Sequence, residues 1–174
     1  MNNLLVSITV RNGVALSLVL CLYSVMMWLT RLDAEYLYIG QYLDMLVVIV
    51  PIFFTFRAIK QAMLQTNLPI THRLLLALGV GFVGYIIHAP YLYVYHNFIN
   101  PDWFDAVVAL EKQNLLAKNV GPQEIASKLQ LMIDRNNAQN QIFKLNAFIA
   151  SVFVLPLLIA CISFIFIRKP KKSQ

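Results

Sequence analysis

The chain contains few charged residues for its length. Asp, Glu, Lys and Arg make up 13% of its 174 residues, whereas a typical soluble domain has roughly 25%. Only two cysteines are present, Cys21 and Cys161, which is too few for a disulfide framework or a zinc site. With 59% hydrophobic residues, the composition excludes an ordinary soluble domain and favours a protein of the lipid bilayer.

Motifs of the common catalytic classes are also missing from the sequence. It has no nucleophile elbow, no H-E-x-x-H motif and no phosphate-binding loop. Gly79, Gly81 and Gly84 match G-x-G-x-x-G, but they lie within an apolar run that offers a phosphate no water. We therefore predict no cofactor and no metal, and we expect the protein not to be an enzyme.

Four apolar runs are each long enough to cross about 30 Å of hydrocarbon as a helix. They are residues 13–30, 36–56, 74–95 and 145–167. The sequence therefore predicts an all-α membrane protein with four transmembrane helices, in which residues 1–174 form a single integral membrane domain.

The segment 97–142 is the one long polar stretch, and it predicts an amphipathic helical hairpin between the third and fourth transmembrane helices. Asn100, Pro101 and Asp102 form a helix-start motif, with Asn100 expected at the N-cap and Pro101 at the first helical position. A second helix should begin near Pro122. Its predicted apolar stripe is Ile125, Leu129, Met132 and Ile133.

The charges between the runs are sorted by side. The side that holds the N-terminus has eight basic residues and no acidic one. These are Arg11, Arg57, Lys60, Arg73, Arg168, Lys169, Lys171 and Lys172. Because Lys and Arg mark the cytoplasmic side, we predict a bacterial inner-membrane protein with both termini cytoplasmic and the hairpin extracytoplasmic. The basic C-terminus is expected to contact anionic lipid rather than nucleic acid.

Asp44 is the one formal charge well inside a predicted span. His88 lies at a matching depth on the antiparallel third span, so the two could form an intramembrane polar site with Gln41 and Tyr85. The alternative is a structural polar pair that fixes the helix register, or an Asp44 side chain near a thinned, partly wet interface.

Small residues on the third predicted span favour close helix packing. Ala77, Gly81 and Gly84 share one helical face with His88, at spacings of four, seven and eleven residues from Ala77. Such faces let the backbones of neighbouring helices approach closely. We therefore interpret the glycines as a helix-packing face.

The stretch from Tyr93 to Phe104, with Ile99-Asn100-Pro101-Asp102 at its centre, resembles a family catalogued as domain of unknown function 4199. That family is similar in having four spans, a glycine-containing third span and a charged helical insertion before the last span. The resemblance implies a bacterial, mostly Bacteroidetes, inner-membrane protein without established catalytic residues. It also implies a partner role beside a polyprenyl-phosphate glycosyltransferase. The chain departs from the family at Trp103, where Phe or Tyr is commoner.

Three functions remain open at this point. The first is a non-enzymatic accessory or interaction subunit with a protein partner, for which envelope biogenesis is the expected process. The second is a small homo-oligomeric transporter or proton-linked channel that uses Asp44 and His88. The third is a membrane enzyme that acts on a lipid-linked substrate at the outer face, near His96 and Asp102.

Overall fold

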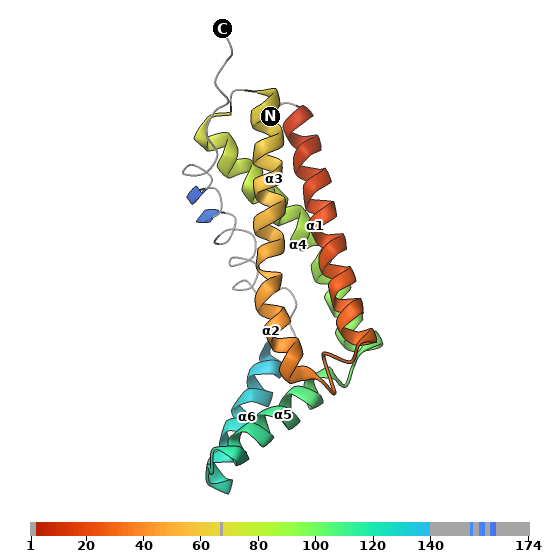
Figure 1. The fold of residues 1–174 in the computed structure, drawn as a ribbon, viewed down its shortest axis with the longest axis vertical. Coiled ribbons are helices and arrows are strands. Elements are labelled where there is room, and N and C mark those ends of the chain that lie inside the picture. Colours follow the sequence, from red (N-terminus) through yellow and green to blue (C-terminus); the bar gives the residue numbers. More distant parts are fainter. Residues whose placement is uncertain (1–2, 67, 140–153, 155–156, 159–160, 163–174) are drawn as a thin grey trace.

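The computed structural model describes residues 3–66, 68–139, 154, 157, 158, 161 and 162. These residues form an all-helical structure (Figure 1). Its elements are α1 (Asn3–Leu29), α2 (Leu37–Val47), α3 (Ile49–Gln65), α4 (Ile70–Val94), the π-helix η1 (Tyr95–Ile99), α5 (Trp103–Ala117) and α6 (Pro122–Gln139). Apart from those isolated positions, the predicted fourth span at 145–167 lies outside the described residues, as do residues 140–142 of the predicted insertion.

Three helices are long and apolar enough to cross a membrane. They cover Asn3–Leu29, Leu37–Gln65 and Ile70–Ile99. Each includes most of a predicted span. Asn3–Leu29 extends its span by ten residues at the start, Leu37–Gln65 by nine residues at the end, and Ile70–Ile99 by four residues at each end. Helix α1 begins ten residues before its predicted span because Leu5 and Ile8 are buried in the bundle core.

The second of these helices is broken at Val48, between α2 and α3. Pro51 lies three residues later and explains the break. A proline has no N–H to donate to the carbonyl four residues earlier, here that of Val47, and its ring clashes with that carbonyl. Val48 keeps right-handed helical dihedral angles, so α2 and α3 still form one membrane-length helix, Leu37–Gln65.

Helices α1, α3 and α4 pack against one another as a bundle (Figure 1). Its centre contains fully buried residues from α3 and α4. They are Ala58, Ile59, Ala62, Ala77 and Val80. Across α1 and α3, the buried Asn12 side chain donates a hydrogen bond to the Gln61 Oε1 atom at 3.0 Å.

Small residues bring α1 and α4 together. A Cβ atom added to Gly13 of α1 would lie 2.6 Å from the Val83 Cβ of α4. One added to Gly84 would lie 2.9 Å from the Leu16 Cδ2 atom, and one added to Gly79 would lie 2.6 Å from the Thr9 Cγ2 atom. A larger side chain would push the helices apart, so glycine allows the close approach.

The members of the predicted packing face lie in different surroundings. Ala77 and Gly84 are buried, and Gly84 faces α1. Gly81 lines a cavity between the helices. Gly79, which the sequence interpretation left out of the face, contacts α1 instead.

Helices α5 and α6 form a hairpin beyond the end of the bundle that is opposite to the N-terminus (Figure 1). Leu115 of α5 and Ile125 of α6 are buried where the two helices meet. The other members of the predicted stripe, Leu129, Met132 and Ile133, are half-buried, whereas their polar neighbours are exposed. Asn119 follows the end of α5 in a left-handed conformation with a φ of 55°, which is uncommon for residues other than Gly, Asn and Asp.

Candidate polar cavity at the hairpin end of the bundle

The structure divides the predicted Asp44 site between two cavities. Asp44 and Gln41 of α2 line an open cavity of about 280 Å³ at the hairpin end of the bundle. Tyr85 and His88 of α4 line a separate cavity of about 230 Å³ between the helices. The sequence gives the depth of each residue along its membrane span, but it does not show which neighbouring helix each side chain faces. The matched depths of Asp44 and His88 therefore do not place them in one site.

Asp44 instead interacts with α1. Its Oδ1 atom accepts a hydrogen bond of 2.7 Å from the Tyr23 hydroxyl, and the Asp44 side chain is exposed on the bundle surface. The His88 ring stacks on Tyr91 of the same helix, with ring centroids 6.2 Å apart. Within the described part of the chain, the His88 Nε2 atom is buried and has no hydrogen-bond partner.

Five elements contribute to the cavity at the hairpin end. Its described lining comes from α1, the turn after it, α2, the end of α4 with η1, and α5. The lining residues are Tyr23, Ser24, Met27, Asp33, Leu37, Gln41, Asp44, Leu92, Tyr95, His96, Trp103 and Val107. Two carboxylates and several aromatic rings thus face one space, and the described lining contains neither Lys nor Arg.

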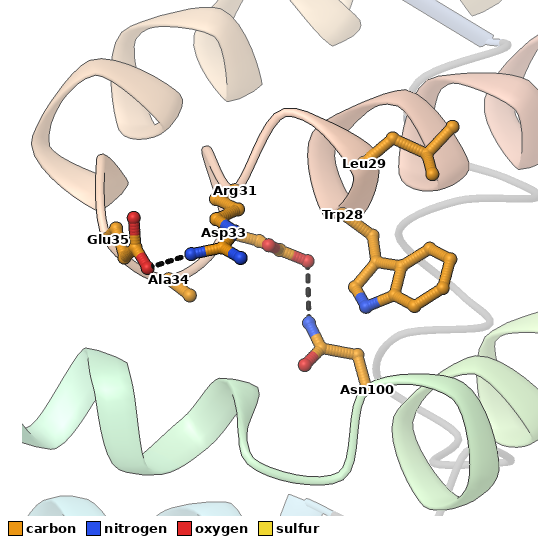
Figure 2. A pocket seen from close by; sticks show the side chains of 7 residues that line it. All are labelled: Trp28, Leu29, Arg31, Asp33, Ala34, Glu35 and Asn100. Carbon is orange, nitrogen blue, oxygen red and sulfur yellow. Dashed lines mark hydrogen bonds and ion pairs between the residues drawn. The ribbon is translucent and has the colours of Figure 1, made fainter.

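Asp33 joins three segments at this end of the bundle. Its Oδ2 atom accepts hydrogen bonds from the Tyr95 hydroxyl and from the Asn100 Nδ2 atom, the latter at 2.6 Å. Figure 2 shows the Asp33 carboxylate directed at the Asn100 amide. We call these three side chains, Asp33, Tyr95 and Asn100, the polar node. The node ties the α1–α2 turn to η1 and to the segment that begins α5.

The α1–α2 turn around Asp33 has a fixed shape. Arg31 adopts a positive φ of 57° and forms an exposed ion pair with Glu35 (Figure 2). A cavity of about 410 Å³ opens beside this turn, next to Trp28 and Asn100. Gly40 of α2 packs so closely on the turn that an added Cβ atom would lie 2.0 Å from the Leu32 carbonyl oxygen.

The start of α5 corrects one prediction. Helix α5 begins at Trp103 with Asp102 at the N-cap, and no side chain caps it. Asn100 was expected at the N-cap, but its side chain donates to Asp33 instead. The prediction was wrong because the Asn100 side chain is oriented by the hydrogen bond that its Nδ2 atom donates to Asp33, and its Oδ1 atom does not accept from the first backbone N–H groups of α5. Pro101 and Asp102 lie in an exposed turn before the helix.

The sequence did not single out Asp33, which the structure places at the centre of the polar node. One feature of the sequence is consistent with this contact: the charges predict that the turn containing Asp33 and the aromatic stretch up to Asn100 lie on the same side of the membrane.

His96 of η1 lies at the same end of the bundle, with its ring centroid 4.5 Å from that of Trp103. In the described structure its buried Nδ1 atom has no hydrogen-bond partner.

These observations define the class of protein: an all-helical chain whose three apolar helices fit a membrane, with a helical hairpin at one end. Residues 11–169 match the family described as protein of unknown function (DUF4199), and the chain belongs to that family. The family resemblance seen in the sequence is therefore confirmed. No curated protein and no solved structure matches the chain.

Proposed function

We propose that the protein is a non-enzymatic accessory subunit of a complex in the bacterial inner membrane and that its hairpin binds the partner. The polar node is the observation that carries this proposal. It uses a carboxylate, a phenol and an amide to fasten the base of the hairpin to the bundle. A satisfied network of polar side chains makes the structure around it rigid. A hairpin held rigidly in this way presents a fixed surface, which supports a role in binding another protein.

The surface of the hairpin supports the same proposal. Leu115 and Ile125 are buried within the hairpin, and most of its remaining surface is polar and compatible with an aqueous environment. Two large apolar side chains, Leu116 and Leu131, remain 54% and 52% exposed. Exposed apolar side chains on a polar surface are candidates for the contact with a partner.

The sorted charges support the sidedness that this role requires. Arg57 and Lys60 are exposed on α3, whose C-terminal end lies away from the hairpin (Figure 1). The hairpin itself carries acidic and basic residues together, such as the Glu124–Lys128 ion pair. Basic residues at the opposite end favour a cytoplasmic position for that end and an extracytoplasmic position for the hairpin. The family resemblance proposes a polyprenyl-phosphate glycosyltransferase as the partner and envelope biogenesis as the process.

The alternative functions receive less support from the geometry. A proton-linked transporter was expected to use Asp44 and His88 together, and the described residues place them in separate cavities. An enzyme at the outer face was expected to use His96 and Asp102. His96 lines the cavity at the hairpin end, whereas Asp102 is exposed in the turn and is not among its described lining residues.

Site-specific photo-crosslinking tests the proposal in the native membrane. A photoreactive amino acid replaces Leu131 on the hairpin, and a matched control replaces Leu64, which is 69% exposed on α3 at the other end of the bundle. We expect the Leu131 position to give one dominant heteromeric adduct that the Leu64 position does not give. Native mass spectrometry of the full chain in mild detergent should then show the same partner at a fixed stoichiometry.

Two results of these measurements would contradict the accessory role. One is adducts only between copies of this chain, together with a homo-oligomer in the mass spectrum, which would favour the transport hypothesis. The other is a monomer without adducts at either position. A polyprenyl-phosphate glycosyltransferase as the captured partner would support the finer proposal, and another stoichiometric partner would overturn that identity alone.

A further inference from the structure

Among the described residues, the lining of the cavity of about 280 Å³ at the hairpin end has two carboxylates and no basic side chain. Asp33 and Asp44 both line it, and within the described structure they accept hydrogen bonds from uncharged groups: the Tyr23 and Tyr95 hydroxyls and the Asn100 amide. The basic residue nearest in sequence, Arg31, lies beside Asp33 on the adjoining cavity of about 410 Å³ and pairs there with Glu35, but it does not line this cavity (Figure 2). A carboxylate at the end of an apolar helix bundle is stabilised when a cation lies beside it.

The other lining residues of this cavity suit an organic cation. Tyr23, Tyr95 and Trp103 present aromatic rings along the cavity, and the faces of such rings attract ammonium groups. The His96 ring packs against Trp103 and leaves a buried Nδ1 atom that no described residue satisfies. A neutral imidazole nitrogen in this state accepts a hydrogen bond from an N–H donor.

We propose that this cavity binds a primary ammonium group. The carboxylates of Asp33 and Asp44 supply the counter-charge, and the rings of Tyr23, Tyr95 and Trp103 form the walls. The ammonium belongs either to the headgroup of an aminolipid or to a small soluble amine. The cavity lies at the ends of the three membrane-length helices, at Leu29, Leu37 and Ile99, where lipid headgroups would lie.

Tryptophan fluorescence reports binding in this cavity. The chain has two tryptophans, and Trp103 lines the cavity whereas Trp28 does not. The Trp28→Phe variant of the full chain, in nanodiscs of phosphatidylglycerol alone, therefore leaves Trp103 as the reporter. We titrate it with ethanolamine and, in parallel, with ethylene glycol, its uncharged isostere, at constant ionic strength. We expect a saturable response to ethanolamine and none to ethylene glycol.

Three further variants test whether a carboxylate in the lining is responsible. Asp44→Asn retains an acceptor for Tyr23 and removes the charge, so we expect ethanolamine to bind at least about tenfold more weakly. Gln41→Glu adds a carboxylate to the lining and should tighten binding. Glu35→Gln removes a carboxylate from the same end of the bundle but outside this lining, so it should leave the affinity unchanged. The circular dichroism spectrum and thermal midpoint of each variant confirm that it is folded.

A second set of nanodiscs distinguishes the two sources of the ammonium. If an aminolipid binds, adding phosphatidylethanolamine should shift the Trp103 spectrum and weaken the ethanolamine response, and Asp44→Asn should abolish that shift. If the ligand is a soluble amine, the titration should be unaffected by this lipid. The proposal is overturned if ethylene glycol acts as ethanolamine does, if Asp44→Asn and Glu35→Gln behave alike, or if no response saturates below about 50 mM.

Discussion

Replacing Asp33 with alanine is expected to loosen the hairpin from the bundle and to lower the free energy of unfolding by about 2–3 kcal/mol. The change removes the acceptor of two hydrogen bonds at once, and the Tyr95 side chain that donates one of them is buried. A buried donor left without an acceptor costs about 1–3 kcal/mol. Hydrogen exchange with mass spectrometry should show faster exchange in α5 and α6 and unchanged exchange where α1 packs on α4.

Glu35→Ala is the matched control for this prediction. Glu35 lies two residues from Asp33 in the same turn, but its ion pair with Arg31 is exposed, with 54% and 67% of the two side chains accessible. Exposed ion pairs contribute about 0–1 kcal/mol. If both variants lose the same stability, or if Asp33→Ala leaves exchange in the hairpin unchanged, the polar node does not hold the hairpin.

Gly40→Ala is expected to be the most damaging single-methyl substitution in the described structure, with a loss of about 3 kcal/mol. The new Cβ atom would lie 2.0 Å from the Leu32 carbonyl oxygen and 2.9 Å from the Met27 Cε atom. The Met27 side chain can rotate away, but the carbonyl belongs to the backbone of the α1–α2 turn. Relief therefore requires α2 to move off the turn, and overpacking of this kind costs about 1–3 kcal/mol or more.

Thermal unfolding in detergent, followed by circular dichroism, measures this loss. Gly121→Ala is the control because a Cβ atom at Gly121 would meet no atom within 4 Å, so its thermal midpoint should match that of the wild type. The damage should also reach the cavity at the hairpin end, since Leu37 and Gln41 of α2 line it. Equal midpoints for the two glycine variants would show that α2 does not pack on the turn as described.

The sequence predicts the parts of this fold that depend on composition and period. Long apolar runs identify the three membrane-length helices because no soluble core could bury them. The stripe from Ile125 to Ile133 identifies the inner face of α6 because its spacing follows the helical period. Helix ends are predicted less well, since Leu5, Ile8, Ala58 and Ala62 extend α1 and α3 through tertiary contacts that composition does not record.

The candidate site depends on directions that a single sequence does not contain. The depth of a residue in a span follows from its position, because each helical residue adds about 1.5 Å. The sequence alone therefore predicts that Asp44 and His88 lie at similar depths. Which neighbour each side chain faces depends on the break at Val48 and on the close contact between α1 and α4. For the same reason Asn100 suggested a local cap, although its partner Asp33 lies 67 residues away in the chain.

Cysteine accessibility tests the central claim, which is that the hairpin and the far end of the bundle lie on opposite sides of a membrane. Single cysteines replace Lys128 on the hairpin and Lys60 on α3, both exposed, in a background that carries Cys21→Ala and Cys161→Ala. A membrane-impermeant maleimide is applied to intact spheroplasts and to lysed ones. We expect the Lys128→Cys variant to react in intact spheroplasts and the Lys60→Cys variant to react only after lysis. Equal labelling of both variants in intact spheroplasts, or the reverse order, would contradict the membrane arrangement on which the proposed partner role depends.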